Sequence, residues 1–189
     1  MSILTAAQVE ADVNYLINGL EVNKRLIPAA STLFKKSSAI PLVTVLLSFL
    51  STVVFYVSSE GNELGIAEFC HFFMTEAWVV VVPSAIIGLF FILFTYNKLM
   101  MYFSVPVEVR KKSIILNHLK EITARIVKVF ISLMICSVIL TPISPWFTFA
   151  IPGLLLVLMF ATGLIVGAEI NRFGTGMALE KISGLLKKI

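Results

Sequence analysis

Residues 147–168 read FTFAIPGLLLVLMFATGLIVGA, a run of twenty-two residues without one charged side chain. A transmembrane α-helix needs about 20 predominantly apolar residues to cross the hydrocarbon core of a bilayer. Three further apolar stretches cover about 39–57, 77–96 and 126–140. The sequence therefore predicts an all-α, polytopic membrane protein with four transmembrane helices in a single membrane domain, residues 1–189.

The composition of the whole chain agrees with this class. Hydrophobic residues make up 58% of the 189 positions, and the mean hydropathy is +0.97. Both values are higher than those of an ordinary soluble domain. The first forty residues are mostly polar and lack the compact apolar core of a cleavable signal peptide, so the first span is expected to act as its own insertion signal.

The distribution of positive charge predicts the topology. The four apolar stretches divide the chain into five segments. All fifteen Lys and Arg residues lie within or beside the first, third and fifth of these. The second and fourth, Ser58 to Glu76 and Thr141 to Trp146, contain none. Positively charged loops resist translocation and stay on the cytoplasmic side. We therefore expect both termini in the cytoplasm, an acidic outer loop and a short outer turn.

Amphipathic cytoplasmic helices are expected at both ends of the chain. Thr5 followed by Gln8 fits a capping box, in which each side chain satisfies a backbone donor at a helix start. Apolar residues then recur at helical spacing within 5–27, inside the cytoplasmic region 1–37. The segment 171–189 has the same periodicity.

The segment 97–125 is predicted to be a cytoplasmic helical extension of the third span. Pro106 marks a helix start and no breaker follows before Leu140, so we expect one continuous helix between these residues. Such a helix would be about 52 Å long. It would project into the cytoplasm, because the hydrocarbon core is only about 30 Å thick.

Two prolines and the outer loop give further expectations. Pro41 should lie in the first turn of the first span, where its missing N–H is harmless. Pro83 should kink the second span or remove one of its internal hydrogen bonds. The segment from Leu64 to Trp78 is expected to be either an interfacial helix or an early extension of the second span.

Small residues and charges near the spans are candidate contact points. Small-xxx-small pairs permit close helix approach, within the chain or with a second copy in a homo-oligomer. Glu169 lies at the cytoplasmic end of the fourth span, and a boundary ion pair is the favoured interpretation over proton or ion coupling. The helix-packing candidates are Ser84, Gly88, Gly163 and Gly167, and the ion-pair candidates are Glu169, Arg172, Arg125 and Lys128.

Catalytic, cofactor and metal sites are not predicted. Glu68, Cys70 and His71 are adjacent in sequence and cannot close a four-ligand site, and His118 is assigned to the opposite face. The chain contains no zincin motif, nucleophile elbow or phosphate-cradling loop. Cys70 is assigned to the outside and Cys136 to the bilayer, so no intramolecular disulfide is expected.

The expected partners are membrane lipid and another membrane protein. The basic residues lie at juxtamembrane positions suited to anionic head groups, and they lack the module signatures of nucleic-acid binding. Two apolar cytoplasmic stripes need cover and are therefore candidate partner contacts. They comprise Ile115, Leu119 and Ile122, and Leu179, Ile182 and Leu186.

The layout of the chain resembles that of a known family. The resemblance lies in the size, the amphipathic start from Val9 to Leu20 and the ending, which reads Gly163-Leu-Ile-Val-Gly167-Ala-Glu169, then Asn171-Arg172-Phe-Gly174, then the helix Met177 to Ile189. In these features the chain is similar to the TraS-type entry-exclusion (surface-exclusion) proteins of F-type conjugative plasmids. The match is one of layout over most of the chain.

The resemblance implies a protein of the bacterial inner membrane that works by binding. It would recognise the mating-pair stabilisation protein of a donor that carries an identical plasmid, and so block redundant DNA transfer. We expect the cytoplasmic helices to do the recognising. An immunity protein against a pore-forming bacteriocin and a small transporter or channel subunit stay open as alternatives.

Overall fold

The fold is all-helical in the residues that the structure, a computed structural model, describes: 5–22, 27–59 and 65–172. No β-strand occurs in these ranges. Four helices are long and apolar enough to cross a membrane, as the sequence predicted. They are α2 (Ala30–Ser58), the run of α3 (Ile66–Phe72), the π-helix η1 (Phe73–Ala77) and α4 (Trp78–Ser104), α6 (Ile114–Leu140) and α7 (Trp146–Arg172).

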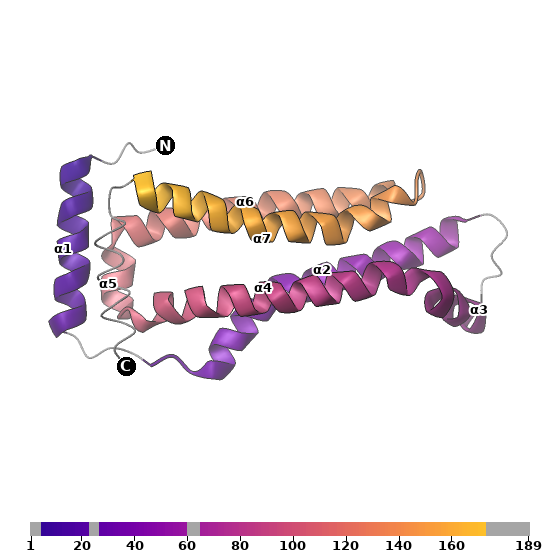
Figure 1. The fold of residues 1–189 in the computed structure, drawn as a ribbon, viewed down its shortest axis with the longest axis horizontal. Coiled ribbons are helices and arrows are strands. Elements are labelled where there is room, and N and C mark those ends of the chain that lie inside the picture. Colours follow the sequence, from indigo (N-terminus) through magenta and orange to yellow (C-terminus); the bar gives the residue numbers. More distant parts are fainter. Residues whose placement is uncertain (1–4, 23–26, 60–64, 173–189) are drawn as a thin grey trace.

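The long helices lie along the longest axis of the molecule as two pairs, α2 with α4 and α6 with α7 (Figure 1). The helix α1 (Ala6–Val22) crosses one end of this bundle, and the short helix α5 (Val107–Lys112) lies between α1 and the long helices (Figure 1). The predicted capping box begins α1. The Thr5 N–H donates to the Gln8 side chain over 3.1 Å, and the Gln8 N–H donates to the Thr5 hydroxyl over 3.4 Å.

Two predictions about helix boundaries are wrong. The helix α2 begins at Ala30, so Pro41 lies inside the helix instead of in its first turn. The expected continuous helix from Pro106 to Leu140 is broken at Ser113, which separates α5 from α6. Helix α4 continues through Pro83.

The segment from Leu64 to Trp78 had two expected forms, an interfacial helix or an early extension of the second span, and the described residues from Ile66 form the extension. The run from α3 through η1 to α4 is helical without interruption, and the π-helical turn lies between α3 and α4. Aromatic side chains fix α3 against α2. Phe69 and Phe72 lie with ring centroids 5.3 and 5.2 Å from the Tyr56 ring, at separations typical of aromatic packing.

Small polar residues fill the contacts of α2. The buried residues Ser37, Pro41, Thr44, Ser48 and Ser51 recur at alternating spacings of four and three along one face. Lipid hydrocarbon is as apolar as leucine, so membrane helices associate through close approach of small residues and interhelical hydrogen bonds. This face of α2 supplies both.

Hydroxyl groups connect α2 to three other helices or their ends. The Ser48 and Ser84 hydroxyls share a hydrogen bond of 2.7 Å between α2 and α4. The Ser51 hydroxyl lies 2.8 Å from that of Thr141, which follows α6, and 3.3 Å from that of Thr148 in α7. In addition to these hydrogen bonds, an apolar cluster joins α4, α6 and α7. Its buried members are Phe91, Met134, Val138, Ile151, Leu155 and Leu158.

The α2–α4 contact should be sensitive to side-chain volume at Gly88. A Cβ at Gly88 would lie 3.1 Å from the Cβ of Pro41, so Gly88→Leu overfills the contact. We expect it to destabilise the protein by about 1–3 kcal/mol. Unfolding by sodium dodecyl sulfate in mixed micelles, followed by circular dichroism, measures this change.

Gly153→Leu is the matched control, because a Cβ at Gly153 would meet nothing within 4 Å. Equal loss of stability in both variants would contradict a close α2–α4 contact at Gly88.

Candidate functional site

The end of the bundle under α1 is the candidate site. The apolar face of α1 is buried here in two clusters. Val9 and Val13 pack against Ile115 at the start of α6, whereas Leu16 packs against Val105 and Val109 around α5. The helix is thereby held on both α5 and α6.

Asp12, on the same face of α1, caps the N-terminus of α6. Its side chain is 7% exposed. One carboxylate oxygen accepts the Ile114 N–H over 3.1 Å, and the other accepts the Ile115 N–H over 3.0 Å and the Ser113 hydroxyl over 2.8 Å. The first N–H groups of a helix have no intrahelical acceptor and carry a partial positive charge, so a carboxylate there satisfies them and is itself stabilised.

Ser113 contributes a second, local cap. Its hydroxyl oxygen accepts the Leu116 N–H over 3.2 Å, while its hydrogen is donated to Asp12. The chain can therefore break at Ser113 without losing backbone hydrogen-bond partners, because the broken end receives acceptors from both Ser113 and α1.

The sequence analysis assigned no role to this pair. Asp12 follows Val9 by three positions and precedes Leu16 by four. It therefore shares the buried face. The signal was an acidic residue inside an apolar stripe, and an N-cap residue type at Ser113 before a new apolar run.

Cations and aromatic rings tie α5 to the ends of α2 and α4. The Arg110 guanidinium lies 4.8 Å from the Tyr102 ring centroid and 4.7 Å from that of Phe103. The Lys36 ammonium of α2 also lies over the Phe103 ring, 4.4 Å from its centroid. Cation–π contacts of this kind contribute about 0.5–1 kcal/mol each at exposed sites.

Glu169, the predicted boundary residue, is 15% exposed and faces α6. One carboxylate oxygen lies 3.5 Å from Arg172, and the other lies 3.7 Å from His118 Nε2. Arg125 is paired instead with Glu121 at 3.2 Å, and the Lys128 side chain is exposed. The structure thus brings Glu169 together with Arg172 and with His118, a residue that sequence reasoning did not associate with it.

The two predicted small-residue pairs differ in their surroundings. Ser84 and Gly88 are buried against α2. A Cβ at Gly163 would meet only Phe94 and Lys98, at 3.7 and 3.9 Å, and one at Gly167 would meet nothing within 4 Å. Gly163 and Gly167 therefore make no close helix contact with the part of the chain that the structure describes.

The beginning of the predicted partner stripe is covered by α1. Ile115 is fully buried, and Leu119 packs against the cluster that Ile115 forms with α1. Ile122 is half-buried. Ile115 is therefore unavailable to a partner, which corrects the sequence-based interpretation. The other predicted contacts, Leu179, Ile182 and Leu186, lie outside the described residues.

The outward face of α1 is a polar surface at this end of the bundle. Glu10, Asn14, Tyr15 and Asn18 are exposed there. We call these four residues the α1 face. Asp12, Val9 and Val13, on the opposite face of α1, fix the helix to the start of α6.

The sequence candidates for metal binding lie elsewhere. Glu68, Cys70 and His71 are exposed on α3, at the end of the bundle opposite α1 (Figure 1). Within residues 5–22, 27–59 and 65–172, no group of three His, Cys, Asp or Glu side chains is placed to hold a metal ion. Cys70 and Cys136 are both free and exposed.

Comparison with protein-family models, with curated proteins and with solved structures finds no match to this chain.

Removing the Asp12 carboxylate should loosen α1 from the bundle. In Asp12→Ala, two backbone N–H groups and the Ser113 hydroxyl lose an acceptor, at a cost of about 1–3 kcal/mol. Hydrogen exchange followed by mass spectrometry should show faster exchange in α1 and in the first turn of α6, with α2 and α7 unchanged.

Glu10→Ala is the control, because it removes an exposed acid from the same helix. Asp12→Asn, which keeps one acceptor oxygen, should fall between the two. Exchange in Asp12→Ala that equals exchange in Glu10→Ala would refute the capping role.

Proposed function

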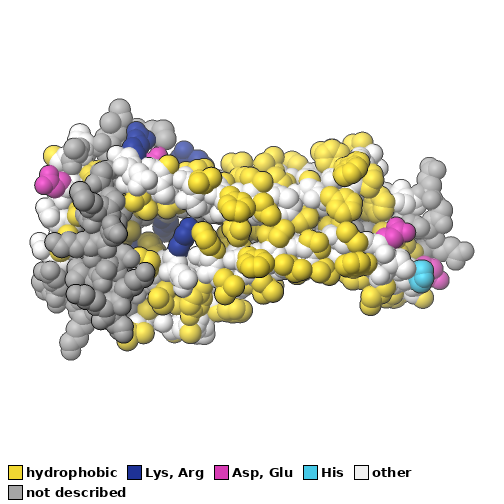
Figure 2. All heavy atoms as spheres, viewed as in Figure 1, with side chains coloured by type: hydrophobic (Ala, Val, Ile, Leu, Met, Phe, Trp, Pro, Cys, Tyr) yellow, Lys and Arg dark blue, Asp and Glu magenta, His cyan; other side chains and the backbone are white. Residues whose placement is uncertain are grey.

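We propose that the protein is a four-span protein of the bacterial inner membrane with the α1 end in the cytoplasm. Charge supports this orientation. Figure 2 shows basic side chains gathered toward the α1 end and acidic side chains with a histidine at the opposite end. The segments Ser58 to Glu76 and Thr141 to Trp146, which connect the helices at that opposite end, contain no Lys or Arg.

Aromatic residues support the same placement. Trp78 and Trp146 begin α4 and α7 at the end opposite α1, and they are 47% and 78% exposed. Tryptophan is enriched where a membrane meets water, because its ring is apolar and its N–H is polar. These two residues therefore suit the outer interface.

We propose further that the protein acts by binding another membrane protein, as an entry-exclusion protein does. The observation that carries this proposal is the fixed α1 face. A helix whose back is buried and capped presents Glu10, Asn14, Tyr15 and Asn18 without further ordering, which lowers the entropic cost of binding. Tyrosine and amide side chains of this kind form specific polar contacts.

The resemblance in layout to the TraS-type proteins suggests which protein the partner is. The partner would be the mating-pair stabilisation protein of a donor with an identical plasmid, and contact at the α1 face would block redundant DNA transfer. The α1 face takes the place of the predicted stripe that begins at Ile115, because α1 buries Ile115.

Mating experiments test the proposal. Recipient cells that produce the protein should receive less DNA from a donor with one F-type plasmid, and unchanged amounts from a donor with an unrelated plasmid. Replacing Asn14 and Tyr15 with alanine should restore transfer while the amount of protein in the membrane stays constant.

Glu76→Ala is the matched control, since it changes an exposed residue at the opposite end. Unchanged transfer from every F-type donor tested would contradict exclusion. Protection of the same cells against a pore-forming bacteriocin would then favour the immunity alternative.

A further inference from the structure

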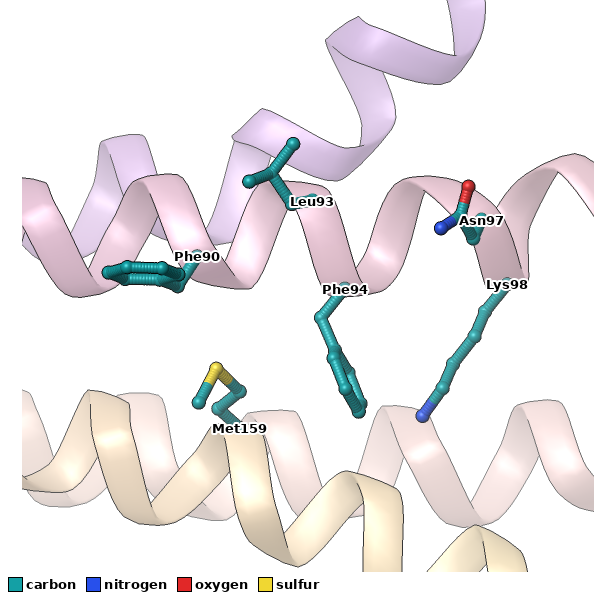
Figure 3. A pocket seen from close by; sticks show the side chains of 6 residues that line it. All are labelled: Phe90, Leu93, Phe94, Asn97, Lys98 and Met159. Atoms are coloured by element: carbon teal, nitrogen blue, oxygen red, sulfur yellow. The ribbon is translucent and has the colours of Figure 1, made fainter.

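A groove of about 500 Å³ lies on the bundle between α4 and α7. It is lined by five residues of α4 and one of α7, namely Phe90, Leu93, Phe94, Asn97, Lys98 and Met159. Phe94 and Lys98 extend from α4 toward α7, and Met159 extends from α7 toward α4 (Figure 3). Figure 2 shows a hollow between the two helix pairs near the α1 end, with a basic side chain beside it.

The groove runs from the edge of the apolar span toward its middle. Lys98 follows Ala77 by 21 residues, or about 32 Å of helix, which matches the thickness of the hydrocarbon core. Phe90 lies eight residues back along α4, about 12 Å deeper. The cation is therefore at head-group level, and the aromatic side chains are at acyl-chain level.

The groove walls are open to the surroundings. Phe90, Leu93 and Phe94 are 59%, 66% and 53% exposed. Among the described residues, Lys98 makes no ion pair with an acid, and its ammonium lies 4.4 Å from the Phe94 ring centroid. The ammonium lies beside Gly163 of α7, because a Cβ at Gly163 would be 3.9 Å from Nζ.

We propose that this groove binds an anionic phospholipid. The lipid phosphate contacts the Lys98 ammonium, and one acyl chain lies along Phe90, Phe94 and Met159. An anionic head group supplies the negatively charged partner that Lys98 lacks among the described residues. An acyl chain covers the exposed aromatic rings. The inference rests on membrane insertion of the bundle and is independent of the entry-exclusion proposal.

A second copy of the chain fits the groove less well. Two copies in one membrane share the same orientation, so a symmetric contact at α4 places two Lys98 side chains at the same depth. Like charges so placed repel each other. The α4 wall is also bulky and aromatic, whereas close contacts between membrane helices use small residues.

Lipid retention tests the head-group contact. The purified, delipidated full chain is incubated with phosphatidylglycerol or with phosphatidylcholine of the same acyl composition and analysed by native mass spectrometry. The wild type should retain phosphatidylglycerol in preference to phosphatidylcholine. Lys98→Gln should lower that preference by roughly five-fold, the effect of one basic residue near the membrane surface.

Two further variants make the result specific. Lys98→Arg should retain the preference, and Lys128→Gln, which removes an exposed cation from α6, should leave it unchanged. Equal losses in Lys98→Gln and Lys128→Gln, or equal retention of the two lipids by the wild type, would overturn the proposal.

Fluorescence tests the acyl-chain contact independently. The tryptophan of Phe90→Trp, in a chain with Trp78→Phe and Trp146→Phe, should be quenched more by phosphatidylglycerol brominated on its acyl chains than by brominated phosphatidylcholine. Lys98→Gln should remove the difference. Equal quenching by the two lipids would show that the groove has no preference for an anionic phospholipid, and a protein dimer that excludes added phosphatidylglycerol would show that a second copy is the occupant. Either result would overturn the proposal.

Discussion

A bilayer offers its helices little hydrophobic attraction for one another, because the lipid is as apolar as the side chains. The long helices of this chain accordingly turn large apolar residues outward, among them Leu46, Leu93 and Leu164, which are 66%, 66% and 72% exposed. The contacts of α2 use small and hydroxylated residues, as in the Ser48–Ser84 hydrogen bond, beside the apolar cluster that joins α4, α6 and α7. In a soluble bundle, by contrast, such leucines are mostly buried and such serines mostly face water.

At the end where α1 lies, the helices pack as they do in water-soluble proteins, through a buried apolar face and a capped helix end. Here α1 buries an apolar face, and the Asp12 carboxylate replaces the missing acceptors at the N-terminus of α6. The same end combines a fixed polar surface, the α1 face, with a cation, Lys98, at the edge of the apolar span. The proposed contact with a partner protein and the proposed contact with a lipid head group would therefore lie close together along the long axis of the molecule.

The sequence predicted the elements of the bundle better than their ends and contacts. Long uncharged runs suffice to predict spans, because few other structures bury them. The break at Ser113 was missed, since Ser113 is no strong breaker and its second capping group, Asp12, lies about a hundred residues away in sequence. Small residues show where two helices can approach each other, but not which helix fills the space. Gly88 lies against Pro41, whereas a Cβ at Gly167 would meet no described residue within 4 Å.

The two native cysteines and one introduced on α1 test the membrane placement most directly. Chains with Cys70 alone, Cys136 alone or Asn14→Cys alone are treated in spheroplasts, before and after lysis, with a membrane-impermeant maleimide, which reacts with thiolates in water. The account predicts that Cys70 reacts in intact spheroplasts and that Asn14→Cys reacts only after lysis. Cys136, which faces lipid, should stay unreactive in both states. Labelling of Asn14→Cys in intact spheroplasts, or ready labelling of Cys136, would contradict the account.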